Sequence, residues 1–141
     1  MFLPIEPWKG GPWSPWHMYK ILLVEDNEMN RDMLSRRLAR RGFDVSTAAD
    51  GYDGIQKARS EGPDLILMDL NLPDIDGWEV TATLKKDHGT TSIPVIALTA
   101  HAMVTDKQKA IDSGCDDFAT KPVEFDSLVQ KINTLLERSR H

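Results

Sequence analysis

The sequence lacks the hallmarks of several protein classes. It has one cysteine, Cys115, among 141 residues, so no disulfide can form within the chain, which suits a reducing compartment. No apolar run approaches the roughly 20 residues of a membrane-spanning helix. The formal net charge is -5, whereas a nucleic-acid-binding surface needs a basic excess. These absences favour a cytoplasmic protein that binds neither membranes nor nucleic acids directly.

What is present falls into two unequal parts. Residues 1–17 hold four of the eight prolines and three of the four tryptophans, without helical or strand periodicity and without a signal-peptide pattern. We interpret them as a disordered or foreign extension and expect one domain over residues 18–141, beginning at Met18. The alternative for the extension is a proline-rich docking peptide.

From Lys20 onward, short apolar runs alternate with helix-like segments. The predicted strands are Ile21–Val24, Val45–Ala48, Leu65–Met68, Pro94–Leu98 and Asp117–Thr120. The predicted helices are Glu28–Arg41, Tyr52–Glu61, Trp78–Lys86, Met103–Ser113 and Phe125–Arg138, the first with Met33, Leu34 and Leu38 on its apolar face. This alternation predicts an α/β fold with a parallel sheet and helices on both faces.

Polar residues gather at the ends of the predicted strands, where ligands bind in open parallel sheets. Glu25 and Asp26 follow the first strand, Asp69 the third, Thr99 the fourth and Lys121 the fifth. Carboxylates as close together as this repel one another unless a cation is present. Oxygen ligands of this kind suit Mg²⁺, with Mn²⁺ as a substitute.

The same residues have the chemistry for phosphoryl transfer, which needs mainly positioning and charge stabilisation. An aspartate such as Asp69 can form an acyl phosphate. The Lys121 ammonium could neutralise phosphoryl charge, and the Thr99 hydroxyl could donate to a phosphoryl oxygen.

Four segments carry a family resemblance. In order along Tyr19–Arg138, ILLVEDN, LILMDLNLPDIDGWE, VIALTAHAM and FATKP resemble the signatures of response-regulator receiver domains. The resemblance implies a flavodoxin-like fold, with five parallel strands in the order 2-1-3-4-5, five helices and a cis peptide before Pro122.

By that resemblance, Asp69 is the phosphoacceptor and also a metal ligand. Glu25 and Asp26 form the acidic pair, of which Asp26 binds the metal directly and Glu25 acts through water. Asn71 gives its backbone carbonyl to the metal.

The resemblance also assigns residues to the response. Thr99 and Lys121 hold the phosphoryl group, and Thr99 and Phe118 form the switch pair. Asn71 and His101 take positions that tune the lifetime of the acyl phosphate. From the residues alone, Phe118 could equally be a core side chain and His101 an ordinary loop histidine.

The function implied is a phosphorylation-activated switch of a two-component system or phosphorelay. Its donor would be a histidine kinase or histidine-phosphotransfer protein, and its output a protein contact through the fourth helix, fifth strand and fifth helix. It would catalyse only its own phosphotransfer and dephosphorylation. Because the chain ends soon after the last predicted helix, we expect a stand-alone receiver.

Two rival functions fit less well, and a third stays open. A phosphatase with an aspartyl nucleophile resembles DxDx[TV], but LNLP follows Asp69. A flavin-binding flavodoxin needs a Ser/Thr/Gly-rich phosphate loop after the first strand, and the charges of Glu25-Asp26-Asn27 are wrong for it. The open alternative is a phosphorylation-independent binding module, which would typically lack an acidic-pair residue, the acceptor or the lysine.

Overall fold

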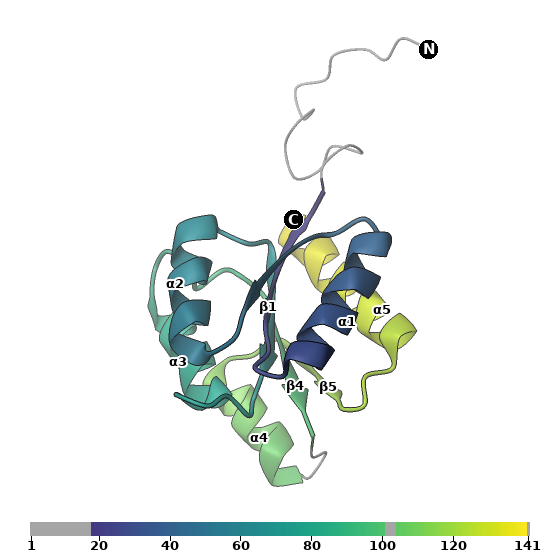
Figure 1. The fold of residues 1–141 in the computed structure, drawn as a ribbon. Helices are drawn as coiled ribbons and strands as arrows, with labels where there is room; N and C mark the ends of the chain where they lie inside the picture. The colour runs from purple at the N-terminus through teal and green to yellow at the C-terminus, as the bar shows by residue number, and fades with distance from the viewer. Residues whose placement is uncertain (1–17, 101–103, 141) are drawn as a thin grey trace, which may run out of the picture.

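The computed structural model describes residues 18–100 and 104–140, over which five strands and five helices alternate (Figure 1). The strands are β1 (Lys20–Val24), β2 (Asp44–Ala48), β3 (Leu65–Asp69), β4 (Val95–Thr99) and β5 (Asp117–Thr120). The helices are α1 (Glu28–Arg40), α2 (Gly51–Glu61), α3 (Gly77–Lys86), α4 (Val104–Ser113) and α5 (Phe125–Arg140).

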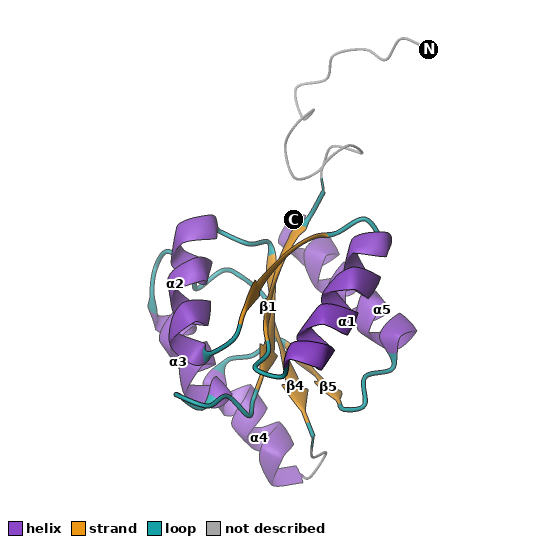
Figure 2. Cartoon of the chain, viewed as in Figure 1, coloured by secondary structure: helices purple, strands orange, loops and turns teal. Residues whose placement is uncertain are grey.

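The strands form one parallel sheet in the order β2-β1-β3-β4-β5, which confirms the predicted topology. Helices cover both faces: α1 and α5 lie on one side, and α2, α3 and α4 lie on the other (Figure 2). All five strands therefore end at the same edge of the sheet.

The inner strand β1 separates two apolar cores. Ile21 and Leu23 pack in the cluster that includes α1 and α5, whereas Leu22 and Val24 pack in the cluster that includes α2 and α3. All four side chains are fully buried. A strand covered on both faces needs the continuous apolar run that the sequence provides.

Short polar residues start three helices at the edge where the strands end. Asn27, Asp50 and Asp76 are the N-caps of α1, α2 and α3, and each accepts a hydrogen bond from a main-chain amide of the first turn. Such caps satisfy amides that have no partner within the helix. They fix where each strand-to-helix loop ends.

The structure departs from the predicted elements in a few places. Helix α1 ends at Arg40, because Arg41 is its C-cap and Gly42 takes a positive φ of 92°. Met33, expected on the apolar face with Leu34 and Leu38, is 51% exposed, and the buried residues of this helix are Leu34 and Leu38. Helix α5 runs two residues beyond its predicted end, and the predicted start of α4, Met103, lies outside the described residues.

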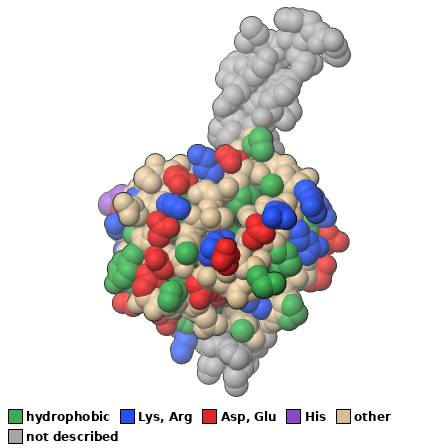
Figure 3. All heavy atoms as spheres, viewed as in Figure 1, with side chains coloured by type: hydrophobic (Ala, Val, Ile, Leu, Met, Phe, Trp, Pro, Cys, Tyr) green, Lys and Arg blue, Asp and Glu red, His purple; other side chains and the backbone are tan. Residues whose placement is uncertain are grey.

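Two properties of the described residues bear on the surface: the lengths of the helices and the arrangement of the charges. Within the described ranges, no helix is both long and apolar enough to span a bilayer. On the face drawn in Figure 3, acidic and basic side chains of the described residues are interspersed rather than gathered by sign.

Candidate functional site

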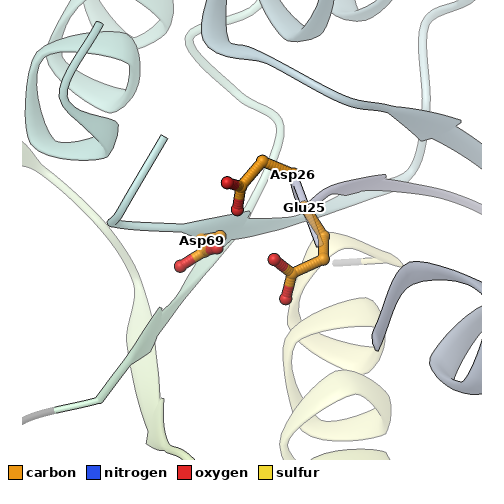
Figure 4. A group of neighbouring side chains, drawn as sticks. All are labelled: Glu25, Asp26 and Asp69. Atoms are coloured by element: carbon orange, nitrogen blue, oxygen red, sulfur yellow. The ribbon is translucent and has the colours of Figure 1, made fainter. Parts of the chain in front are cut away.

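Three carboxylates meet at the carboxyl edge of the sheet. Glu25 and Asp26 follow β1, and Asp69 ends the neighbouring strand β3 (Figure 4). One oxygen of each lies within 4.8 Å of the others. Glu25 is 2% exposed and Asp69 is 1% exposed, whereas Asp26 faces solvent. The predicted grouping of these three residues is confirmed, since parallel strands bring their carboxyl ends together.

The main chain of the acidic pair is held from two sides. The Glu25 amide donates to the Ala48 carbonyl at the end of β2, at 3.0 Å. The Arg31 guanidinium, on α1, donates to the carbonyls of Glu25 at 2.9 Å and Asp26 at 3.3 Å. Arg31 was not among the site residues predicted from the sequence. Its signal is its place one turn into the helix that follows the acidic strand end, from which a long side chain can reach back.

Lys121 bridges the two buried carboxylates. Its ammonium nitrogen Nζ lies 2.9 Å from Glu25 Oε1 and 3.2 Å from Asp69 Oδ1. Its own main-chain amide donates to the Thr99 carbonyl at 2.7 Å, which fixes it just beyond β5. The Lys121–Pro122 peptide bond is cis, in agreement with the resemblance.

The charges in this site are unevenly balanced. Burial, reinforced by the neighbouring Asp69, raises the pKa of Glu25 to about 7 even though the Lys121 ammonium opposes the rise. Burial would lower the pKa of Lys121, but the contacts with Glu25 and Asp69 outweigh it, so its pKa lies above the ordinary value. The Lys121 ammonium thus pairs with two of the three clustered carboxylates, and a donor set of hard oxygens with surplus negative charge fits a divalent cation.

The other predicted residues occupy neighbouring positions. Thr99 is buried at the end of β4, one residue beyond the Leu98 that pairs with Asp69. The Asn71 amide donates to Asp69 Oδ1 at 3.1 Å. Phe118 is half-buried on β5, and the Lys131 ammonium lies 5.8 Å from its ring centroid. The predicted tuning residue His101 lies outside the described residues.

Two hollows flank the acidic site. One, of about 400 Å³, lies between Asp26 and the loop of residues 70–76. The other, of about 440 Å³, lies beside Glu25 and Lys121 and is lined further by side chains of α1 and the start of α5. One hollow therefore borders the exposed Asp26, and the other borders Glu25 and Lys121.

The comparisons with known proteins point to one family. The family model of the response regulator receiver domain matches residues 21–133. The chain is 39% identical over 122 residues to the DNA-binding dual master transcriptional regulator RpaA of Synechocystis, covering 86% of this chain and 51% of RpaA. It is 36% identical over 116 residues to the polar-differentiation response regulator DivK of Brucella ovis, covering 82% of this chain and 94% of DivK.

A solved structure agrees with these relatives. The receiver domain of a Pseudomonas aeruginosa sensor histidine kinase, solved with a magnesium ion in its active-site cleft, superposes with a TM-score of 0.80 at 31% identity. The match covers 86% of this chain and 99% of that domain. The chain spans about half the length of RpaA but nearly all of DivK. With the family match over most of its length and the sheet order of the fold, the chain belongs to the response regulator receiver domain family.

Proposed function

We propose that this receiver domain is a phosphorylation-activated switch whose acceptor is Asp69. The donor is the phosphohistidine of a histidine kinase or of a histidine-phosphotransfer protein. The observation that carries the proposal is the Lys121 ammonium, 3.2 Å from a buried Asp69 carboxylate and 2.9 Å from Glu25. A nucleophilic carboxylate beside a fixed positive charge is the arrangement that phosphoryl transfer needs.

The carboxylates of Glu25, Asp26 and Asp69, with the Asn71 carbonyl, would hold Mg²⁺, or Mn²⁺ in its place. When bound, the ion supplies positive charge that keeps the carboxylates ionised and offsets charge on the phosphoryl oxygens. The surplus negative charge of the cluster and its oxygen donors support this assignment.

In the transfer step, an Asp69 carboxylate oxygen attacks phosphorus and forms a P–O bond. The P–N bond to the donor imidazole breaks, and the imidazole leaves with the electron pair and takes up a proton. Lys121 stays protonated beside Asp69 and neutralises charge on the transferred group. The Thr99 hydroxyl donates a hydrogen bond to a phosphoryl oxygen. The chain catalyses only this transfer and the later hydrolysis of its own acyl phosphate.

The response couples this site to the surface. Thr99 moves toward the phosphoryl group, and Phe118 turns inward into the space that Thr99 leaves. The face formed by α4, β5 and α5 then changes and contacts a downstream protein. Asn71, whose amide contacts the acceptor, and His101 adjust how long the acyl phosphate survives.

The test is phosphorylation by acetyl phosphate, read by intact mass with and without Mg²⁺. We expect one labile phosphoryl adduct that requires Mg²⁺ in the wild type and in the control Asp87→Ala, whose site lies on the α3–β4 connection. Asp69→Ala should show no adduct. An adduct that persists in Asp69→Ala would refute the acceptor. A wild type that accepts phosphate neither from acetyl phosphate nor from a phosphorylated histidine-phosphotransfer domain would be a phosphorylation-independent binding module.

A further inference from the structure

The loop of residues 70–76, which joins β3 to α3, borders the acidic site and is fastened at both ends. At its start, the Asn71 amide donates to Asp69 Oδ1 at 3.1 Å. At its far end, the Gly77 amide donates to the Leu70 carbonyl at 3.3 Å. The loop thus closes on itself at the edge of the sheet, with Asn71 next to the acidic cluster.

The middle of the loop is fastened to a different element. Asp74 Oδ1 accepts from the Gly51 amide at 2.8 Å, and Asp74 Oδ2 accepts from the Tyr52 amide at 3.0 Å. Both amides belong to the first turn of α2, where helical amides need partners from outside the helix. The helix has its own cap as well, since Asp50 accepts from the Asp53 amide at 2.8 Å. The loop therefore places a second carboxylate, that of Asp74, at the start of α2 beside the carboxylate of Asp50.

The approach of loop and helix is close. A Cβ atom on Gly51 would lie 2.1 Å from Ile75 Cγ2 and 2.9 Å from Val80 Cγ2, so only glycine allows this contact. Desolvation raises the pKa of Asp74, but the Tyr52 and Gly51 amides outweigh it and hold the pKa below its ordinary value. The carboxylate is thus ionised at neutral pH, as two amide donors require.

The segment that leads into α2 also contacts the acidic pair, Glu25 and Asp26, through the main chain. The Glu25 amide donates to the Ala48 carbonyl, and Ala48 ends the strand that leads into α2 through Asp50. One side of the acidic site is thus tied to this segment through Glu25. The other side is tied to it through Asp74.

We propose that Asp74 is a positioning residue for the cation site: by holding the loop against the first turn of α2, it sets the distance between Asn71 and the carboxylates. This inference rests on the proposed function. A hollow of about 400 Å³ lies between Asp26 and the loop, and we expect it to widen when this tether is cut. Outer partners of metal ligands typically change metal affinity by about 10–100-fold when removed.

The experiment is a Mg²⁺ titration of the full chain, followed by ¹H–¹⁵N correlation spectra, which also report whether each variant is folded. We expect Asp74→Ala to weaken Mg²⁺ affinity by about 10-fold. Asp74→Asn keeps one acceptor oxygen and should give an intermediate loss, and it serves if Asp74→Ala does not fold. The matched control is Asp50→Ala, which removes the other aspartate at the start of α2 without releasing the loop, and it should bind Mg²⁺ like the wild type.

A second readout separates positioning from stability. If Asp74 acts on the cation site, saturating Mg²⁺ should return the phosphorylation rate of Asp74→Ala to the wild-type rate. Unchanged Mg²⁺ affinity in both Asp74 variants, beside a wild type that binds, would refute the inference alone. An equal loss in Asp50→Ala would also refute it, because the effect would then come from weakening α2. A wild type without Mg²⁺-dependent shifts would refute the cation site, and the inference with it.

Discussion

Gly77, the first residue of α3, offers a sharp test of how tightly the site is packed. A Cβ atom there would lie 2.4 Å from the Asp69 carbonyl oxygen and 2.7 Å from Leu70 Cα. Both are main-chain atoms, one in the last residue of β3 and one in the residue after it, so neither can rotate away. To reach an ordinary contact of 3.4 Å, α3 and β3 must move about 1 Å apart in Gly77→Ala.

The expected magnitude follows from two opposing effects. Overpacking in a well-packed region costs about 1–3 kcal/mol, and a clash with two main-chain atoms belongs at the upper end. Replacing glycine by alanine in a helix recovers about 1 kcal/mol through propensity and the entropy of the unfolded chain. We therefore expect Gly77→Ala to lower the free energy of unfolding by about 2 kcal/mol, or the Tm by about 8 °C.

Thermal and urea unfolding measure this loss, with Gly89→Ala as the control. Gly89 has a negative φ, and its Cβ would meet only Asp87 Oδ1, at 3.9 Å, so its substitution should change stability by less than about 0.5 kcal/mol. Because the displaced atom belongs to Asp69, the phosphorylation rate of Gly77→Ala should fall as well. Equal unfolding midpoints for the two variants would refute the packing account.

Three further predictions use other parts of the fold. Leu128→Ala empties a fully buried position and should lower the unfolding free energy by about 2–5 kcal/mol in urea, and a loss below about 1 kcal/mol would contradict it. Burial raises the pKa of the Cys115 thiol from 9.0 to about 11, so iodoacetamide should modify it about 100-fold more slowly at pH 7.5 than an exposed thiol, as mass spectrometry can show. The Arg59 guanidinium and the Gly89 amide hold the pKa of Asp87 below its ordinary 3.8, so this carboxylate contributes stability at neutral pH that is lost as the pH falls below 3.8. Asp87→Asn should therefore be less stable than the wild type at pH 7, and urea unfolding should show the difference shrinking as the pH falls below 3.8; a difference that stays constant with pH would contradict it.

The sequence predicted the fold and the acidic cluster because both follow from local patterns. Apolar runs that end in Glu25 and Asp69 define parallel strands, and parallel strands place their ends together. Lys121 was predicted to join them, and it does. The roles of these residues in phosphorylation stay predictions until the acceptor is tested.

What the sequence did not reveal depends on contacts between distant segments. The hydrogen bonds between Asp74 and the start of α2 join residues that are 22 and 23 positions apart. They can form only because the loop packs closely against Gly51. In the sequence, Arg31 does not differ from the other charged residues of its helix. Only the structure shows that it donates to the carbonyls of Glu25 and Asp26. Met33 has the helical spacing of Leu34 and Leu38, but it lines the hollow beside Lys121 and is half exposed.

Because β1 contributes side chains to both cores, the sheet separates the molecule into two packing layers. Ile21 and Leu22 are neighbours along the chain, yet each belongs to a different packing layer. Ile21 instead shares its layer with Leu128, more than a hundred positions away. The changes in unfolding free energy caused by two substitutions should therefore be coupled when both lie in one layer, and additive when they lie on opposite faces of the sheet. A protein engineer could redesign the residues beneath α1 and α5 without retuning those beneath α2 and α3.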